Sequence, residues 1–262
     1  MKLRGVMDIL DAIAPPVLAE QWDHSGLRLG DPDAEITRIA VALDASERGI
    51  RSAASLECEL LVTHHPLMFQ PPENLVCTSF DARAIAAAFA CGVSVAACHT
   101  NWDSARGGVN EHLAGLAGLS AVQPLLPPAD PCGFGMGAVG DAEASDADDF
   151  CRRVARAWSL SGYRLLGESK TVRRAALGGG ACGFLWRYAL RSGADVFITS
   201  DMKYHECLEA LDAGLCLMLC DHGEMENPSM APLADRLRAD SGLSVCALPD
   251  DAEPRHGRWR SV

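Results

Sequence analysis

The sequence contains no cysteine pair in C-x-x-C spacing, although cysteine itself is frequent, with 11 in 262 residues. The cysteines are odd in number and scattered, and most of them lie in apolar runs. This pattern excludes zinc-finger spacing and argues against a disulfide framework. We therefore interpret the cysteines as small core residues of a protein in a reducing compartment.

Long apolar segments and concentrated positive charge are also missing. No apolar run approaches the length of a bilayer span, and residues 1–10 lack the apolar core of a signal peptide. The formal net charge of -12 argues against nucleic-acid binding through a general basic surface, and no polybasic membrane patch is present. We expect a soluble, cytoplasmic protein with no membrane contact.

Apolar runs alternate with helical patterns along the chain, which predicts an α/β fold with a parallel sheet covered by helices. Ser46 is a candidate N-cap and Gly92 a candidate C-cap of two of the helices. The expected helices span residues 6–13, 46–57, 80–90, 109–119, 146–158, 184–191, 204–213 and 229–238. The expected strands span residues 36–43, 60–63, 93–98, 172–177, 195–199, 215–220 and 245–248, and a polar tail follows from Glu253.

Polar clusters follow three of the apolar runs. They are His64-His65, where Pro66 ends the strand, then His99 to Asp103, and Asp221 to Glu226. The carboxyl ends of parallel strands are where ligands bind in open α/β sheets. Imidazole and carboxylate together suit divalent zinc, iron or manganese.

The candidate metal ligands number more than a single catalytic zinc takes, and they fit two metals joined by a bridging carboxylate. They are His64, His65, Asp103, His222 and Glu226. Adjacent residues of an extended chain point in opposite directions, so we expect His64 and His65 to bind different ions. Two ions held close together lower the pKa of a bridging water, which suits hydrolysis.

Each candidate also has a simpler interpretation. The paired histidines could lie in a solvated turn, Asp103 could cap the following helix, His222 could be a turn residue, and Glu226 could favour a helix N-terminus. Their joint occurrence at the ends of predicted strands favours the metal site.

Four separated motifs in this order resemble the GTP cyclohydrolase 1 type 2 homologue family, also called Nif-three-like. They are Val62 to Pro66, His99 to Asp103 with residues 107–110, Ile198 to Asp201 with residues 203–205, and His222 to Glu226. The resemblance extends from Trp22-Asp23 to Glu226. It implies a dinuclear metal site, two α/β domains and a ring-shaped homohexamer built as a trimer of dimers. The family's ligands correspond to the same five residues.

The resemblance also implies a discontinuous fold. A metal-binding α/β domain would comprise residues 1–125 and 220–262, and a second α/β domain, residues 126–219, would be inserted into it. The metal site would lie at strand carboxyl ends between them. The composition agrees, because proline and glycine are concentrated in residues 121–137. Two positions depart from the family, which commonly has Gly where Ser200 stands and Asn where His24 stands.

Two histidines are candidate catalytic residues by the same resemblance. His99 matches a family histidine close to the site, and His205, with Lys203, belongs to the site region. His205 could serve as a general acid or phosphate contact, or it could simply cap or pack in its helix. Gly178-Gly179-Gly180 could cradle a phosphate, but it lacks the full phosphate-loop signature, and a tight turn is the alternative.

The residues and the resemblance together leave two functions open. One is a dinuclear metal-dependent hydrolase acting on a small nucleotide-type substrate, by resemblance GTP. The other is a non-enzymatic, metal-binding hexamer that acts as a scaffold or regulator.

Overall fold

The computed structural model describes residues 1–70, 72–168 and 170–248. The chain forms two compact units, one from residues 1–102 and 230–248 and the other from residues 103–229. Each unit contains one sheet with helices, so the predicted α/β class is confirmed. The domain bounds at residues 125 and 220 stay a prediction, and the tail from Glu253 lies outside the described residues.

The sheet of the first unit has five strands in the order β1-β4-β3-β2-β11. The strands β11, β2, β3 and β4 are parallel, and β1 is antiparallel to β4. Every residue of β3 and β4 is buried, as their continuous apolar runs predict. The strands span Gly26–Leu29 (β1), Arg38–Ala42 (β2), Leu60–Thr63 (β3), Ser94–Ala97 (β4) and Ser244–Ala247 (β11).

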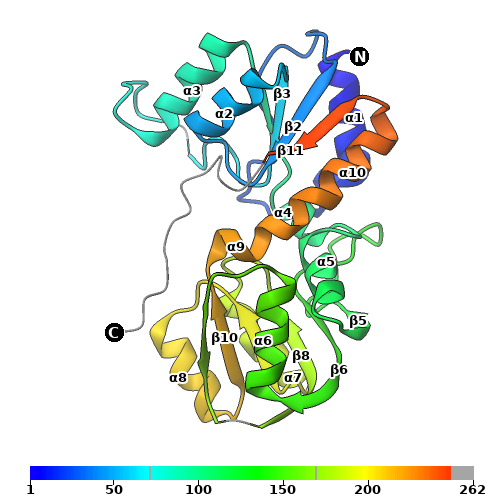
Figure 1. Ribbon diagram of the computed structural model, residues 1–262, viewed down its shortest axis with the longest axis vertical. Helices are drawn as coiled ribbons and strands as arrows, with labels where there is room; N and C mark the ends of the chain where they lie inside the picture. The colour runs from blue at the N-terminus through cyan, green and yellow to red at the C-terminus, as the bar shows by residue number, and fades with distance from the viewer. Residues whose placement is uncertain (71, 169, 249–262) are drawn as a thin grey trace. The chain divides into compact units, whose positions relative to one another are not determined.

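Helices cover both faces of this sheet (Figure 1). On one face α2 and α3 pack on the strands through buried apolar side chains, including Ile50, Ala53, Ala84 and Ala88. On the other face α10 packs against β2, β11 and α1. The helices span Leu3–Ile13 (α1), Glu47–Ser55 (α2), Phe80–Cys91 (α3) and Met230–Ser241 (α10), and a 3-10 turn (η1) spans Pro16–Leu18.

Both predicted caps of the first unit are confirmed. The Ser46 hydroxyl accepts a hydrogen bond from the Gly49 amide (2.9 Å) at the start of α2. Gly92 adopts the left-handed conformation (φ 67°) at the end of α3. Ser46 fixes the residue at which α2 begins, and Gly92 fixes the residue at which α3 ends before β4.

The sheet of the second unit has six strands in the order β5-β6-β8-β9-β10-β7. Its centre, β8-β9-β10, is parallel, and the other three strands are antiparallel to their neighbours. The strands span Ser120–Gln123 (β5), Ala138–Asp146 (β6), Tyr163–Leu166 (β7), Thr171–Leu177 (β8), Val196–Thr199 (β9) and Cys216–Cys220 (β10).

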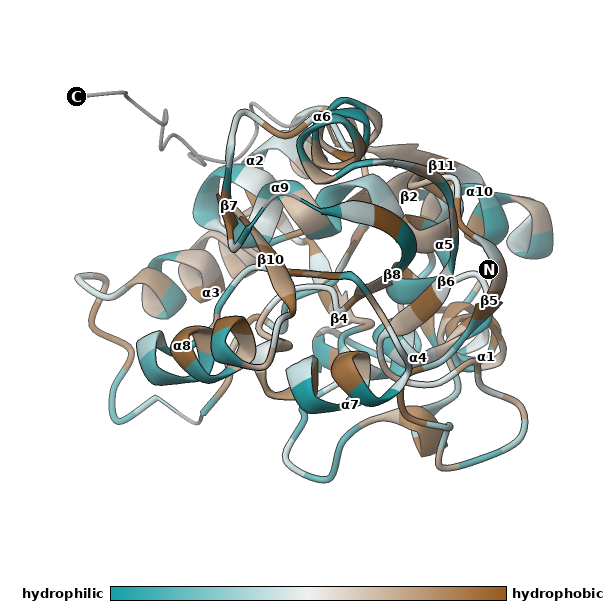
Figure 2. Ribbon diagram, turned by 90° about the horizontal axis from the view of Figure 1, so that it is seen from below, coloured by the Kyte–Doolittle hydropathy of each residue, from teal (hydrophilic) through white to brown (hydrophobic). Residues whose placement is uncertain are grey.

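Helices α7 and α8 pack on one face of this sheet around Phe197 and Leu217, and α5 and α6 contact other parts of it. In Figure 2, β10 is hydrophobic along its length, while hydrophobic and hydrophilic residues alternate around α7 and α8. The helices span Val109–Leu116 (α5), Ala147–Ala157 (α6), Trp186–Arg191 (α7), Tyr204–Asp212 (α8) and His222–Glu226 (α9), with 3-10 turns at Gly183–Leu185 (η2) and Asn227–Ser229 (η3). A further short helix, α4 (Thr100–Ser104), joins the two units along the chain.

The sheets also contain antiparallel strands that the sequence analysis did not predict. The parallel strands were all expected, but β1, β5, β6 and β7 were not, and all four are antiparallel. The segments α4 and α9, at which a His and an acid lie four residues apart, are short helices, so this spacing is one helical turn. Each sheet is therefore a parallel centre with antiparallel strands added at its side.

The cysteines are free thiols, and six of the eleven are buried. Burial raises the pKa of the Cys98 and Cys151 thiols to about 12, so these thiols are neutral and poor metal ligands at neutral pH. This agrees with their interpretation as core residues. Within the described residues, no helix has both the length and the apolar character needed to cross a bilayer.

Candidate metal centre

Three histidines gather at one edge of the first sheet. Strands β3 and β4 are adjacent and parallel, with Thr63 paired to Ala97, so His64, His65 and His99 all follow the carboxyl ends of these strands. The ring nitrogens that could serve as ligands lie within 4.8 Å of one another. We call these three residues the histidine cluster.

Each ring of the histidine cluster is held through its Nδ1 atom. His64 Nδ1 lies 2.9 Å from the Cys98 carbonyl oxygen, and His65 Nδ1 lies 2.6 Å from Asp44 Oδ1. His99 Nδ1 lies 2.6 Å from Asp23 Oδ1. A carbonyl oxygen can only accept, so His64 donates its Nδ1 proton and presents the lone pair of Nε2. This is how metal-binding histidines are commonly oriented in proteins.

Asp23 organises the loop behind His99. Its carboxylate also accepts hydrogen bonds from the Ser25 hydroxyl (2.7 Å) and from the amide and hydroxyl of Thr100 (3.0 and 2.6 Å). Burial opposes ionisation of Asp23, but the hydrogen bonds from His99, Thr100 and Ser25 outweigh it and hold its pKa well below the usual range. Asp23 is therefore a fixed negative charge against the His99 ring.

The second unit holds another candidate pair at the end of β10. His222 and Glu226 lie one turn apart on α9, whose N-cap, Asp221, accepts a hydrogen bond from the Glu224 amide (3.0 Å). His222 Nδ1 lies 2.7 Å from Asp201 Oδ2, and His222 Nε2 lies 3.1 Å from Glu226 Oε2. Only 3% of Glu226 is exposed. We call these two residues the His222–Glu226 pair.

The contact within this pair fits a cation. If the Nδ1 proton is the one donated to Asp201, a neutral His222 points a lone pair at the Glu226 carboxylate. Two acceptors at 3.1 Å repel each other unless a proton or a metal ion lies between them. Two ligands of one tetrahedral zinc are about 3.3 Å apart, given metal–ligand bonds near 2.0–2.1 Å. The observed separation therefore suits one ion held by both side chains.

Gly180 provides the space for the pair. It has a positive φ of 64°, and a Cβ atom there would lie 2.0 Å from Glu226 Oε1 and 2.9 Å from His222 Nε2. A side chain at this position would displace both candidate ligands. The amide of Gly179 donates to Asn110 Oδ1 (2.9 Å). The Gly178–Gly180 segment is thus closely packed against its neighbours.

Asp103 lies within α4 in the second unit, and it does not cap the next helix. The N-cap of α5 is Gly108, which has no side-chain hydrogen bond. The Asp103 carbonyl accepts a hydrogen bond from Asn110 Nδ2 (3.0 Å). Buried Asn110 therefore contacts both the last turn of α4 and the amide of Gly179. The capping interpretation of Asp103 is therefore wrong, and His222, the first residue of α9, is not a plain turn residue.

The family model for Duf34/NIF3 (NGG1p interacting factor 3) matches residues 1–254 of the chain. The chain belongs to this family. It is similar to a Lactococcus lactis protein named GTP cyclohydrolase 1 type 2 homolog, with 30% identity over 260 residues that cover 97% of this chain and 98% of the relative. A Streptomyces coelicolor protein of the same name is 34% identical over 215 residues, covering 80% of this chain and 75% of the relative.

A more distant relative matches in sequence, and a solved structure matches in fold. Drosophila melanogaster NIF3-like protein 1 is 28% identical over 229 residues, covering 86% of this chain and 78% of its own. The crystal structure of a Bacillus cereus protein related to NIF3 superposes with a TM-score of 0.91 at 19% identity, covering 98% of this chain and 99% of that one. The resemblance drawn from the four motifs is confirmed.

In this Duf34/NIF3 chain, the residues that orient the histidines were not identified from the sequence. Asp44, Asp23 and Asp201 each accept from a histidine Nδ1 atom. One signal was available, because Asp44 and Asp201 come two residues after the ends of β2 and β9. Acids placed at strand ends next to histidines could have been interpreted as supports.

The two candidate catalytic histidines differ in setting. His99 is 9% exposed and lies in the histidine cluster, with its ring centroid 5.2 Å from that of His64. His205 is exposed in the first turn of α8, next to the Tyr204 ring. The first unit of this Duf34/NIF3 chain thus carries a histidine group that could hold a metal ion, and the second unit carries the His222–Glu226 pair. Imidazole and carboxylate donors suit zinc, iron or manganese.

Proposed function

We propose that this chain is a metal-dependent hydrolase that binds two divalent ions through His64, His65, Asp103, His222 and Glu226. The single observation that supports it best is the shared orientation of the histidines. In each candidate ligand His64, His65 and His222, Nδ1 contacts an oxygen, and Nε2 therefore faces away from its support. Rings held in this way are prepared to bind metal without reorganising.

The number of candidate ligands supports two ions. Three imidazoles and two carboxylates exceed the set that a single catalytic zinc takes, and a carboxylate can bridge two ions. When bound, such ions supply Lewis-acid activation and make water a better nucleophile at neutral pH.

The chain's own residues have distinct tasks in this proposal. His64 and His65 present nitrogen ligands, and Asp44 keeps the His65 ring in one tautomer. His99 Nδ1 is held by the ionised Asp23, which leaves Nε2 as the His99 atom that would accept a proton and return it. His205 on α8 is the second candidate for proton transfer or phosphate contact.

A nucleotide-type substrate is the finer part of the proposal. The names of the relatives, GTP cyclohydrolase 1 type 2 homolog, support a guanine nucleotide. We further propose that the chain acts as a cytoplasmic homohexamer. Large apolar side chains are exposed on α3 and the loop before it, among them Phe89 (72% exposed) and Leu75 (59% exposed), and patches of this kind commonly mark an interface.

The test combines metal analysis, turnover and mass. We expect about two ions per chain in the purified protein, given five ligands, and hydrolysis of GTP or a related nucleotide. His65→Ala and Glu226→Gln should each lower metal content and turnover together while light scattering still reports six copies. The exposed carboxylate variant Asp240→Asn is the matched control and should change neither.

Two outcomes would contradict the proposal. If both variants keep their full metal content, these residues are not ligands. If the metal-loaded hexamer turns over no nucleotide or phosphoester, the non-enzymatic scaffold is the better explanation.

A further inference from the structure

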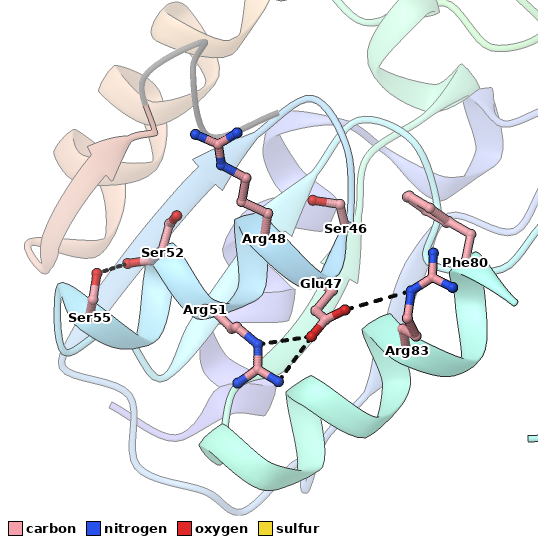
Figure 3. Close-up of a pocket in the computed structure, with 8 residues that line it drawn as sticks. All are labelled: Ser46, Glu47, Arg48, Arg51, Ser52, Ser55, Phe80 and Arg83. Carbon is pink, nitrogen blue, oxygen red and sulfur yellow. Dashed lines mark hydrogen bonds and ion pairs between the residues drawn. The ribbon is translucent and has the colours of Figure 1, made fainter. Parts of the chain in front are cut away.

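A groove of about 570 Å³ runs along the exposed side of α2 in the first unit, between α2 and the start of α3. Figure 3 shows the side chains that line it, which come from both helices. Three of them are arginines, Arg48, Arg51 and Arg83, and Phe80 also lines the groove. None of these residues belongs to the proposed metal centre.

The groove is positive in a chain whose formal net charge is -12. Glu47 is the acid among its lining residues, and it faces two of the three arginines. Its Oε1 atom lies 3.0 Å from Arg51 Nη2, and its Oε2 atom lies 3.7 Å from Arg83 Nε. One carboxylate against three guanidinium groups leaves a net positive charge. Such a groove attracts anions.

The arginine contacts also fix donors in place. Arg51 turns its Nε and Nη2 atoms to Glu47, and Arg83 turns its Nη1 atom to the Thr78 carbonyl oxygen (2.9 Å). A guanidinium group has five N–H donors, so both side chains keep further donors for a ligand. Exposed ion pairs of this kind add little stability, but they restrict the side chains near the groove.

Phe80 favours a ligand larger than a bare phosphate. Its side chain is 53% exposed although it lines a groove, and it lies beside Arg83 (Figure 3). An aromatic face next to guanidinium groups suits a planar ring that carries phosphates. The groove also has the volume of a site for a small organic molecule, whereas a lone phosphate would leave most of it empty.

We propose that this groove binds a nucleotide, with its phosphates on Arg51 and Arg83 and its base against Phe80. The site is separate from the proposed metal centre, and the proposal does not depend on hydrolase activity. Because phosphate contacts dominate, binding should weaken as salt increases.

The experiment measures ATP binding to the full chain by calorimetry in the presence of EDTA, which keeps nucleotide from binding through metal. We expect the double variant Arg51→Ala/Arg83→Ala to bind ATP at least tenfold more weakly. Arg156→Ala, an exposed arginine on α6, is the matched control and should bind as the wild type does. Phe80→Ala should weaken binding of ATP and leave binding of inorganic tripolyphosphate unchanged.

A further variant, His65→Ala, separates this groove from the metal centre and should bind ATP as the wild type does. The proposal is wrong if the wild type does not bind ATP, or if His65→Ala loses binding while the arginine variants keep it. Equal binding of ATP and tripolyphosphate, unchanged by Phe80→Ala, would replace the nucleotide with bare phosphate and overturn the assignment. None of these results bears on metal content or hydrolysis.

Discussion

At the scale of single residues, the candidate site depends on oxygen atoms that accept a hydrogen bond from a histidine ring. Asp44, Asp23 and Asp201 are carboxylates, and the Cys98 carbonyl oxygen has the same task for His64. A carboxylate behind an imidazole fixes its tautomer and raises its basicity. The geometry of the rings is therefore part of the folded protein before any ion binds.

The lack of a side chain at Gly180 is a second residue-scale requirement. We predict that Gly180→Ala loses at least half of the bound metal, because its Cβ would clash with Glu226 and His222. Gly193→Ala is the matched control, since Gly193 also has a positive φ (76°) but nothing lies within 4 Å of an added Cβ. Both variants should lose about 1 kcal/mol of stability from the backbone strain. Metal analysis of both proteins, with denaturant unfolding, checks the difference; full metal content in Gly180→Ala would contradict it.

The ionised state of Asp23 predicts a pH dependence. Its folded pKa is lower than the value of about 3.9 in an unfolded chain, so its contribution to stability is complete above pH 5 and decreases as the pH falls towards the folded pKa. Asp23→Asn should therefore lie further below the wild type in free energy of unfolding at pH 5 than at pH 3.

Urea unfolding of the metal-free proteins at the two pH values measures this gap, the difference in free energy of unfolding between the wild type and the variant. The exposed-carboxylate variant Asp240→Asn serves as the control, and its gap should stay near zero. A gap for Asp23→Asn that is the same at pH 5 and pH 3 would show that the Asp23 carboxylate does not favour the folded state.

At the scale of elements, the sequence predicted the strands that are buried on both faces. β3, β4, β9 and β10 are continuous apolar runs, and each was expected close to its observed bounds. The strands that were missed carry a weaker pattern. β1 is half-buried throughout, and most of β5 and much of β6 are exposed. Antiparallel strands with one solvated face lack the long apolar run that marks a central strand.

The candidate ligands were predictable for the same reason. The histidines directly follow runs that had to be buried, so their place at a strand end followed from burial. Asp23 and Gly180 could not be found in this way. Asp23 lies in a loop before β1, a strand with no clear pattern, and the need for a glycine at position 180 arises from Glu226, 46 residues later in the sequence.

The cap of α2 gives an element-scale prediction. Ser46 is 3% exposed and accepts from the Gly49 amide, so Ser46→Ala should cost about 1 kcal/mol of stability. Ser55→Ala in the same helix is the control, because the exposed Ser55 caps no amide and alanine is the better helix former. Chemical unfolding of both variants measures the effect. Equal stability of the two would show that the cap contributes nothing to α2.

At the scale of the whole molecule, the proposed ligands are divided between the two units. His64 and His65 belong to one, and Asp103, His222 and Glu226 belong to the other. Metal binding by all five, as we propose, would make the loaded protein more resistant to unfolding than either unit could be alone, because bound ions favour the state that holds every ligand. The nucleotide groove, in contrast, is formed within the first unit.

The exposed thiols provide sites for spectroscopic labels. Cys77 and Cys132 are the exposed cysteines of the eleven, and one lies in each unit. Maleimide probes should react with these two positions first, without any engineered residue. A donor dye and an acceptor dye, or a pair of spin labels, would then report how the separation of the two units in solution responds when zinc or manganese is added.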